Sequence, residues 1–117
     1  MVVIVSALRS AIGRYGGSLR NTSPEELVAT LMKNNLSSVG IDGTHVDEVI
    51  IGHTKQSAHN PNIARLALLK ADLPKHIPAH TIHMQCASGM QAIINGAMSI
   101  MVGKNDVVLA GGVEIMS

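Results

Sequence analysis

The sequence predicts an α/β fold with a largely parallel sheet. Short runs of aliphatic and β-branched residues alternate with longer segments of helical periodicity, in the order β-α-β-α-β-α-β. Two of the short runs, Val2–Ala7 and Asp106–Ala110, are rich enough in apolar residues to indicate strands buried on both faces. The 117 residues are enough for one domain with its own core.

The first half of the chain supplies a strand, a loop and a helix. Val2–Ala7 is the predicted strand, and the polar, glycine-bearing stretch Leu8–Asn21 is a long loop. Ser23 is a typical N-cap residue and Pro24 suits the first helical position, so we expect a helix to begin there. Its apolar spacing continues until Gly40, which favours a helix end.

The next elements repeat this alternation. Val46–Ile51 predicts a second strand, and His53–Asn60 a polar loop. Helical spacing then predicts a helix over Asn62–Ala71, opened by Pro61. After a linker, Ala79–Gln85 predicts a third strand.

The last helix is predicted over Ser88–Val102, fifteen residues without a charged side chain. Apolar residues cover most of its circumference, which is typical of a helix buried nearly all round. One sheet covers only one side, so something else must cover the other. A turn leads to the strand Asp106–Ala110, and Gly111-Gly112 is interpreted as a sharp turn that closes it.

Composition narrows the class of protein. Nine basic and eight acidic residues give a net charge of +1, which points to neither nucleic acid nor an anionic membrane. A single cysteine forms no internal disulfide, no run reaches about 18 apolar residues, and the N-terminus lacks the pattern of a signal peptide. We therefore expect a cytoplasmic location. The mean hydropathy of +0.28 predicts apolar surface that meets another chain or segment.

Cys86 is the candidate nucleophile because it lies at a strand-to-helix turn. The first N–H groups of a helix have no partner within the helix and carry partial positive charge, so they stabilise a thiolate. Ala87, Ser88 and Gly89 are small and leave room for a substrate. Placement alone leaves open a second interpretation, a buried structural cysteine.

Other motifs favour less specific interpretations. His80 and His83 are three residues apart on a strand and point to opposite faces, and no Cys or carboxylate has ligand spacing with them, so we expect no metal site. His83 would point away from Cys86 or lie well along the strand, so it is not the expected base. The chain has no glycine-rich nucleotide-binding motif.

Four collinear stretches together resemble the N-terminal part of a thiolase. They are Val3-Ile-Val-Ser-Ala-Leu-Arg9 with Ile12-Gly13 and Gly16-Gly17; Val46-Asp-Glu-Val-Ile-Ile-Gly52; Asn62-Ile-Ala-Arg-Leu-Ala-Leu-Leu69; and Gln85-Cys-Ala-Ser-Gly89 followed by Ala110-Gly-Gly-Val-Glu-Ile-Met-Ser117. The resemblance implies the layered thiolase fold, with residues 1–117 as the N-terminal portion of its N-terminal domain. Ala87, where Gly is common in the family, is a mild departure.

The resemblance also implies a chemistry. Cys86 would be acylated by an acyl-CoA, with its own backbone N–H donating to the oxyanion. The activity would be Claisen condensation of acetyl-CoA or thiolysis of a 3-ketoacyl-CoA, with the coenzyme A thioester as substrate and no bound cofactor. The residues that bind coenzyme A are not assigned. A solvated loop is the favoured interpretation of Arg9, Arg14 and Arg20 over contacts to its phosphates.

Thiolases are several times longer, and the resemblance places an activating histidine and a second cysteine in their C-terminal half. We therefore expect little activity from these residues alone. The alternative is a non-catalytic thiolase-like half that serves dimerisation or completes a partner chain. A related ketosynthase is disfavoured by Gln85–Gly89. The family pattern implies a homodimer or larger assembly, with Ala79–Gln85 at the contact.

Overall fold

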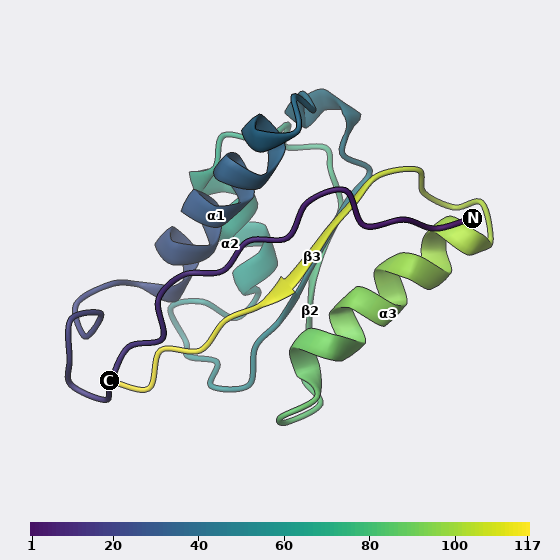
Figure 1. The fold of residues 1–117 in the computed structure, drawn as a ribbon. Coiled ribbons are helices and arrows are strands. Elements are labelled where there is room, and N and C mark those ends of the chain that lie inside the picture. The colour runs from purple at the N-terminus through teal and green to yellow at the C-terminus, as the bar shows by residue number, and fades with distance from the viewer.

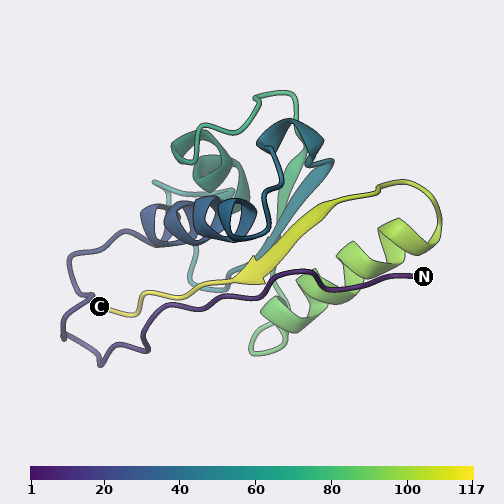
Figure 2. The ribbon, with the colours of Figure 1, turned by 45° about the horizontal axis from the view of Figure 1, so that its top comes forward.

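The computed structural model describes all residues, 1–117, as three layers with the sheet in the middle (Figure 1). Helices α1 and α2 cover one face of the sheet and α3 covers the other, as a second view also shows (Figure 2). The elements are α1 Pro24–Ser38, a short 3-10 turn Gly43–His45, β1 Glu48–Gly52, α2 Ile63–Lys70, β2 Ala79–Ile82, α3 Ser88–Met101 and β3 Val108–Gly112.

The sheet has three strands in the order β2-β1-β3, and both pairings are parallel. Val49 in the central strand lies opposite Ala79 on one side and Leu109 on the other. All five residues of β1 are buried, whereas β2 and β3 form the two edges. The predicted α/β class and parallel sheet are confirmed, and the predicted strand Ala79–Gln85 does lie at an edge.

The start of α1 follows the predicted capping chemistry, whereas α2 begins at Ile63, after an N-cap that was not predicted. Ser23 Oγ accepts a hydrogen bond of 3.3 Å from the N–H of Glu26, and Pro24 is the first residue of α1. In α2 the N-cap is Asn62, whose side-chain oxygen accepts from the N–H of Arg65 at 3.3 Å. The same side chain donates to the carbonyl of Ala79 at 3.0 Å, which ties α2 to the edge strand.

The main core lies between the sheet and the α1/α2 layer. It consists of 14 buried residues from both helices, β1 and the connecting segments: Val28, Ala29, Met32, Leu36, Val46, Val49, Ile51, Ile63, Ala64, Ala67, Leu68, Ala71, Leu73 and Ile77. Side chains of alternate strand residues point to opposite faces, so Val49 and Ile51 face this core. Ile50 and Gly52 face α3.

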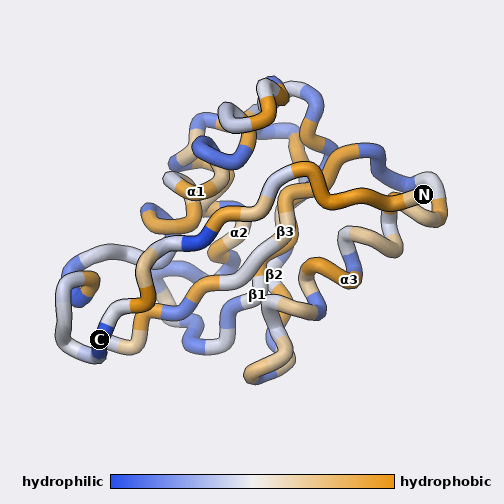
Figure 3. The backbone as a smooth tube through the Cα atoms, viewed as in Figure 1, coloured by the Kyte–Doolittle hydropathy of each residue, from blue (hydrophilic) through white to orange (hydrophobic).

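The predicted strand over Val2–Ala7 is wrong for these residues. Residues 1–13 make no backbone–backbone hydrogen bond, and Val3, Ile4 and Val5 are exposed. The apolar segment runs past β3 and α3 in an extended path (Figures 1 and 2), and its hydropathy stands out in Figure 3. Apolar, β-branched residues favour a strand, but a strand exists only where another backbone pairs with it. No strand of this chain does so.

Two further boundaries differ from the prediction. The strand predicted over Ala79–Gln85 ends at Ile82, where its pairing with Gly52 ends, and Gln85 adopts a left-handed backbone angle φ of 51° that no strand accommodates. Gly111 and Gly112 do not form a turn after the last strand, because both pair with β1 inside β3. No helix is long and apolar enough to cross a membrane.

Helix α3 spans nearly the predicted residues, but it is not buried all round. Ser88, Ala92 and Gly96 form its buried stripe against the sheet. The other apolar side chains project away from the sheet and are exposed or half-buried; the exposed ones include Met90, Ile93, Ile94, Met98 and Met101. Within these residues nothing covers the outer surface of α3.

Candidate active site

Cys86 lies in a tight turn between the end of β2 and the start of α3, as predicted. In Figure 1 this turn projects beyond the end of the sheet, below the first turn of α3. The thiol is exposed, and neither Sγ nor the backbone N–H of Cys86 makes a hydrogen bond within the chain. The exposure removes the alternative of a buried structural cysteine.

The turn is held by hydrogen bonds on both sides of Cys86. The N–H of Ala87 donates to the carbonyl of Met84 at 3.1 Å, and the N–H of Ser88 donates to the carbonyl of Gln85 at 3.2 Å. The hydroxyl of Ser88 makes two further bonds, to Met84 and Gln85. The residues that flank Cys86 are therefore fixed while Cys86 itself stays free.

The start of α3 rests directly on the carboxyl ends of β1 and β3. A Cβ atom added to Gly52 would lie 2.3 Å from the carbonyl carbon of Ser88, and one added to Gly112 would lie 3.0 Å from Cα of Gly89. Only glycine permits this backbone-on-backbone contact. Gly52, and less tightly Gly112, thus set the height of the Cys86 turn above the sheet.

The N-terminus of α3 presents free donors beside Cys86. The N–H groups of Gly89 and Met90 have no acceptor within the chain, and Ala87 at the N-cap provides no side-chain cap. Unpaired N–H groups and the helix dipole favour negative charge at this end. The arrangement suits a thiolate or an oxyanion. No side chain that acts as a base hydrogen-bonds to Cys86.

A second polar cluster joins the ends of β1 and β3. The carboxylate of Glu114 accepts hydrogen bonds from the N–H and the hydroxyl of Thr54, the latter at 2.6 Å, and from the N–H of Lys55 at 3.2 Å. Burial acts to raise the pKa of Glu114, but these hydrogen bonds and the nearby His53 outweigh it, so the pKa lies below its usual value. Glu114 is thus held as a carboxylate that ties the two loops together.

His53 is the most buried member of this cluster, at 1% exposure. Its Nδ1 lies 2.8 Å from the carbonyl of Val113, and since a carbonyl only accepts, Nδ1 carries the proton. Nε2 is buried without a hydrogen-bond partner. The sequence does not indicate this burial, because the loop His53–Asn60 is polar and the contacts of His53, with Val113 and Glu114, come from a segment about 60 residues away.

None of the remaining candidates forms a hydrogen bond with Cys86. His80 pairs with Glu48 at 3.1 Å, near the opposite end of the sheet, and His83 is exposed. The structure gathers no group of three His, Cys, Asp or Glu side chains suited to a metal ion. Arg9, Arg14 and Arg20 lie in the exposed loop, where Arg20 donates to the carbonyl of Gly17 at 3.2 Å.

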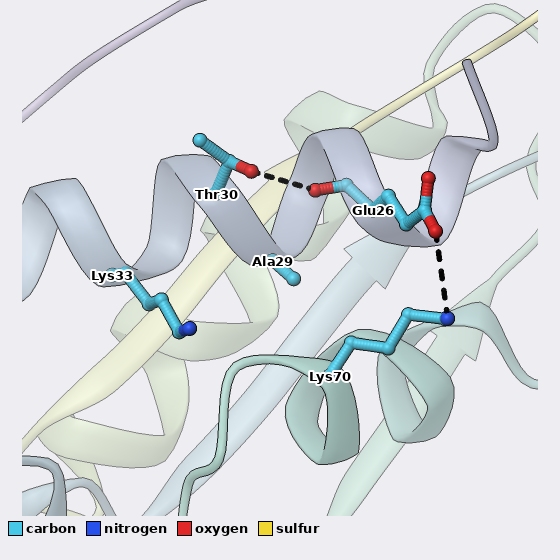
Figure 4. A pocket seen from close by; sticks show the side chains of 5 residues that line it. All are labelled: Glu26, Ala29, Thr30, Lys33 and Lys70. Carbon is cyan, nitrogen blue, oxygen red and sulfur yellow. Dashed lines mark hydrogen bonds and ion pairs between the residues drawn. The ribbon is translucent and has the colours of Figure 1, made fainter.

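Two surface hollows lie elsewhere. One of about 310 Å³ lies over α1 and α2 and is lined by Glu26, Ala29, Thr30, Lys33 and Lys70, with an ion pair of 3.7 Å between Lys70 and Glu26 (Figure 4). The other, about 380 Å³, lies near the C-terminus and includes Arg20, His53 and Lys55. Cys86 lines neither of these two hollows.

Comparison with known proteins decides the family. The model of the thiolase N-terminal domain matches residues 2–117. The chain belongs to the thiolase family. The resemblance carried by the four sequence stretches and the layered fold it implied are therefore confirmed.

Individual thiolases agree with this assignment. An acetyl-CoA acetyltransferase of Synechocystis sp. is 41% identical over 99% of the chain, and a probable acetyl-CoA acyltransferase of Staphylococcus aureus is 40% identical over the same share. The crystal structure of the Bacillus anthracis acetyl-CoA acetyltransferase superposes with a TM-score of 0.93 at 46% identity, over 96% of the chain. The chain spans 28–30% of the length of these proteins.

Proposed function

We propose that this chain provides the acyl-accepting cysteine of a thiolase-type acyl-CoA acyltransferase. The observation that carries the proposal is an exposed, unbonded thiol at the N-terminus of α3, beside N–H groups that have no acceptor. Membership of the thiolase family supports an acyl-CoA thioester, such as acetyl-CoA or a 3-ketoacyl-CoA, as the substrate.

In the proposed step the thiolate of Cys86 attacks the carbonyl carbon of the thioester. A bond forms between Sγ and that carbon, and the bond to the sulfur of coenzyme A breaks. The proton that Cys86 loses ends on the coenzyme A thiol. The backbone N–H of Cys86 donates to the oxygen that becomes negative in the tetrahedral intermediate. Nothing in the chain competes for that N–H.

The proton acceptor for Cys86 and the second half-reaction have no candidate beside the thiol. We assign them to further polypeptide, since the similar acyltransferases are more than three times as long as the chain. In the second half-reaction coenzyme A, or the enolate of a second acetyl-CoA, takes the acyl group from Cys86.

Acylation of Cys86 tests the proposal directly. The chain is incubated with acetyl-CoA and examined by intact mass and peptide mapping, which are unambiguous because the chain has one cysteine. We expect one acetyl group on Cys86 and none on the variant Cys86→Ala. Acetylation confined to lysine side chains, at equal levels in both proteins, would refute the proposal.

Steady-state turnover gives the complementary test. Because no base or second cysteine accompanies Cys86, we expect the isolated chain to show no thiolysis of acetoacetyl-CoA above background. Turnover by this chain that disappears in Cys86→Ala would show that these residues hold a complete catalytic set after all.

A second function, association, is favoured by the exposed apolar surface of α3 and by β2 at the sheet edge. An edge strand presents unpaired backbone groups to another chain. In this alternative the chain serves as a structural half that pairs with a copy of itself or completes a partner. The acetylation experiment separates the two functions, because a purely structural half needs no reactive cysteine.

A further inference from the structure

We infer that Ser88 is a positioning residue for Cys86, acting through the backbone of Met84 and Gln85. The inference rests on the proposed role of Cys86 as the nucleophile. Ser88 is 4% exposed, so its hydroxyl lies beneath the turn and contacts the turn backbone rather than solvent.

The hydroxyl of Ser88 bridges the two residues before Cys86. Its Oγ accepts from the N–H of Met84 at 2.8 Å and donates to the carbonyl of Gln85 at 2.7 Å. The directions are fixed, because an N–H only donates and a carbonyl only accepts. One hydroxyl thus uses its single proton and one lone pair to close the turn from within.

The bridge holds a backbone conformation that the chain would otherwise leave. Gln85 has φ of 51°, in the strained left-handed region that non-glycine residues rarely occupy. Relaxation of Gln85 to an extended conformation would swing Cys86, the next residue, away from the N–H groups of Gly89 and Met90. The two bonds of Ser88 oppose that relaxation.

The backbone of Ser88 is itself clamped. It lies against Gly52 so closely that a Cβ on Gly52 would come within 2.3 Å of it. Ser88 therefore connects a rigid support, the carboxyl end of the central strand, to the turn that carries the thiol. Other residues of the turn lack this link, since Ala87 has no hydroxyl and Gly89 no side chain.

The test compares Ser88→Ala with Ser88→Thr and with Ser99→Ala. Ser99 is a matched control on the same helix, because its hydroxyl also donates to a carbonyl, that of Gly96 at 2.7 Å, and accepts from Asn105 at 3.0 Å. The readouts are the rate of iodoacetamide alkylation of Cys86, amide hydrogen exchange at Met84, and circular dichroism as a check of folding.

We expect Ser88→Ala to change the alkylation rate by roughly tenfold, as expected when a reacting group shifts by a fraction of an ångström to an ångström, and to speed exchange at Met84. We expect Ser88→Thr to keep the alkylation rate of Cys86 and the exchange rate at Met84 near the parent values, because it keeps the hydroxyl. We expect Ser99→Ala to leave the alkylation rate within about twofold of the parent value, which corresponds to the usual effect of a surface substitution. A folded Ser88→Ala protein with the parent alkylation rate would overturn the inference. So would an equal effect of Ser99→Ala.

The alkylation assay needs no acyl-CoA and so does not depend on the proposed function. If acetyl-CoA fails to acylate Cys86, the proposed function fails, whereas the positioning role of Ser88 is decided by alkylation and exchange alone. The two conclusions can therefore be rejected separately.

Discussion

The two faces of the sheet bury their apolar side chains in different ways. On the α1/α2 face, large side chains such as Met32, Ile63 and Leu68 interlock in a core of 14 buried residues. On the α3 face the helix contributes only small buried residues, packed over Ile50 of the sheet, while Met90 and Met101 remain 64% and 72% exposed. One face completes its own core. On the other face the backbones are in close contact near Cys86, whereas the outer side of α3 is exposed.

The two faces therefore have different roles, since one stabilises the fold and the other positions the candidate nucleophile. The α1/α2 face has the apolar burial that holds the sheet together. The α3 face contributes close backbone contacts that determine where the cysteine turn lies, at Gly52 and Gly112 of the sheet. Substitutions on the two faces should therefore differ in size and in what they change.

The largest expected effect is on the completed face. Leu68→Ala removes a fully buried side chain from the core, and we expect it to lower the free energy of unfolding by about 2–5 kcal/mol. Met101→Ala, on the outer side of α3, should cost about 0.5 kcal/mol or less. Urea denaturation of both variants measures the contrast. Similar costs at the two positions would mean that α3 is covered in solution.

The next effect concerns the backbone contact below Cys86. Gly52→Ala places a Cβ 2.3 Å from the carbonyl carbon of Ser88, so α3 must move, at a cost of about 1–3 kcal/mol or more. Gly111→Ala is the matched control, because a Cβ there meets nothing within 4 Å. We expect Gly52→Ala alone to alter the alkylation rate of Cys86. An unchanged rate would show that the turn does not depend on this contact.

Local chemistry made part of this structure predictable. Ser23-Pro24 is a helix start in almost any context, because the cap uses only neighbouring backbone N–H groups. The position of Cys86 at a strand-to-helix turn followed from the same kind of short-range pattern. The order of elements then indicated a parallel sheet, which needs no knowledge of long-range contacts.

Features that depend on distant neighbours were not predictable. Val2–Ala7 has a strand composition, yet pairing requires another backbone at its side, and composition does not reveal whether one is present. Gly111-Gly112 has the composition of a turn, but Gly112 is needed because Gly89 passes 3.0 Å from its absent Cβ. The buried His53 likewise arises from packing between segments far apart in the sequence, since its partner Val113 lies 60 residues away. The bridging hydroxyl of Ser88 is local, with Met84 four and Gln85 three residues away, but a serine in the first turn of a helix does not reveal by itself which backbone groups it binds.

The pH dependence of the free energy of unfolding should report on Glu48, a polar side chain on the α3 side of the sheet. Burial acts to raise the pKa of Glu48, but hydrogen bonds from Asn105 and Lys104 and the nearby charges of Lys104 and His80 lower it below its usual value. A lowered folded pKa means that the stabilisation is complete above the unfolded value, about 4.3 for glutamate, and is lost as pH falls through the folded value. Urea midpoints should therefore fall between about pH 6 and about pH 3.

The variant Glu48→Gln isolates this contribution from that of Glu114, whose pKa is also lowered. The amide cannot ionise, so the stability difference between the parent protein and Glu48→Gln should be largest near neutral pH and shrink in acid. We expect a difference of about 1.5–3 kcal/mol at neutral pH, the range for hydrogen bonds to a charged group. A difference that stays constant with pH would mean that the loss of stability in acid comes from another group.

Substitutions on the exposed outer side of α3 should have the smallest effect on the free energy of unfolding but should affect association with another chain. Met90→Ser and Met98→Ser change side chains that are 64% and 51% exposed, so each should alter the free energy of unfolding by about 0.5 kcal/mol or less at low protein concentration. The same surface, together with the segment Ala79–Gln85 that begins with the edge strand β2, is where we expect a dimer or larger assembly to form, since apolar area left in water favours contact with another chain. Sedimentation at micromolar concentration should show association in the parent protein and less of it in the double variant, with Lys33→Ser on α1 as a surface control. A parent protein that sediments as a compact monomer would contradict the association, and would require that the extended segment Val2–Ala7 folds over α3 in solution.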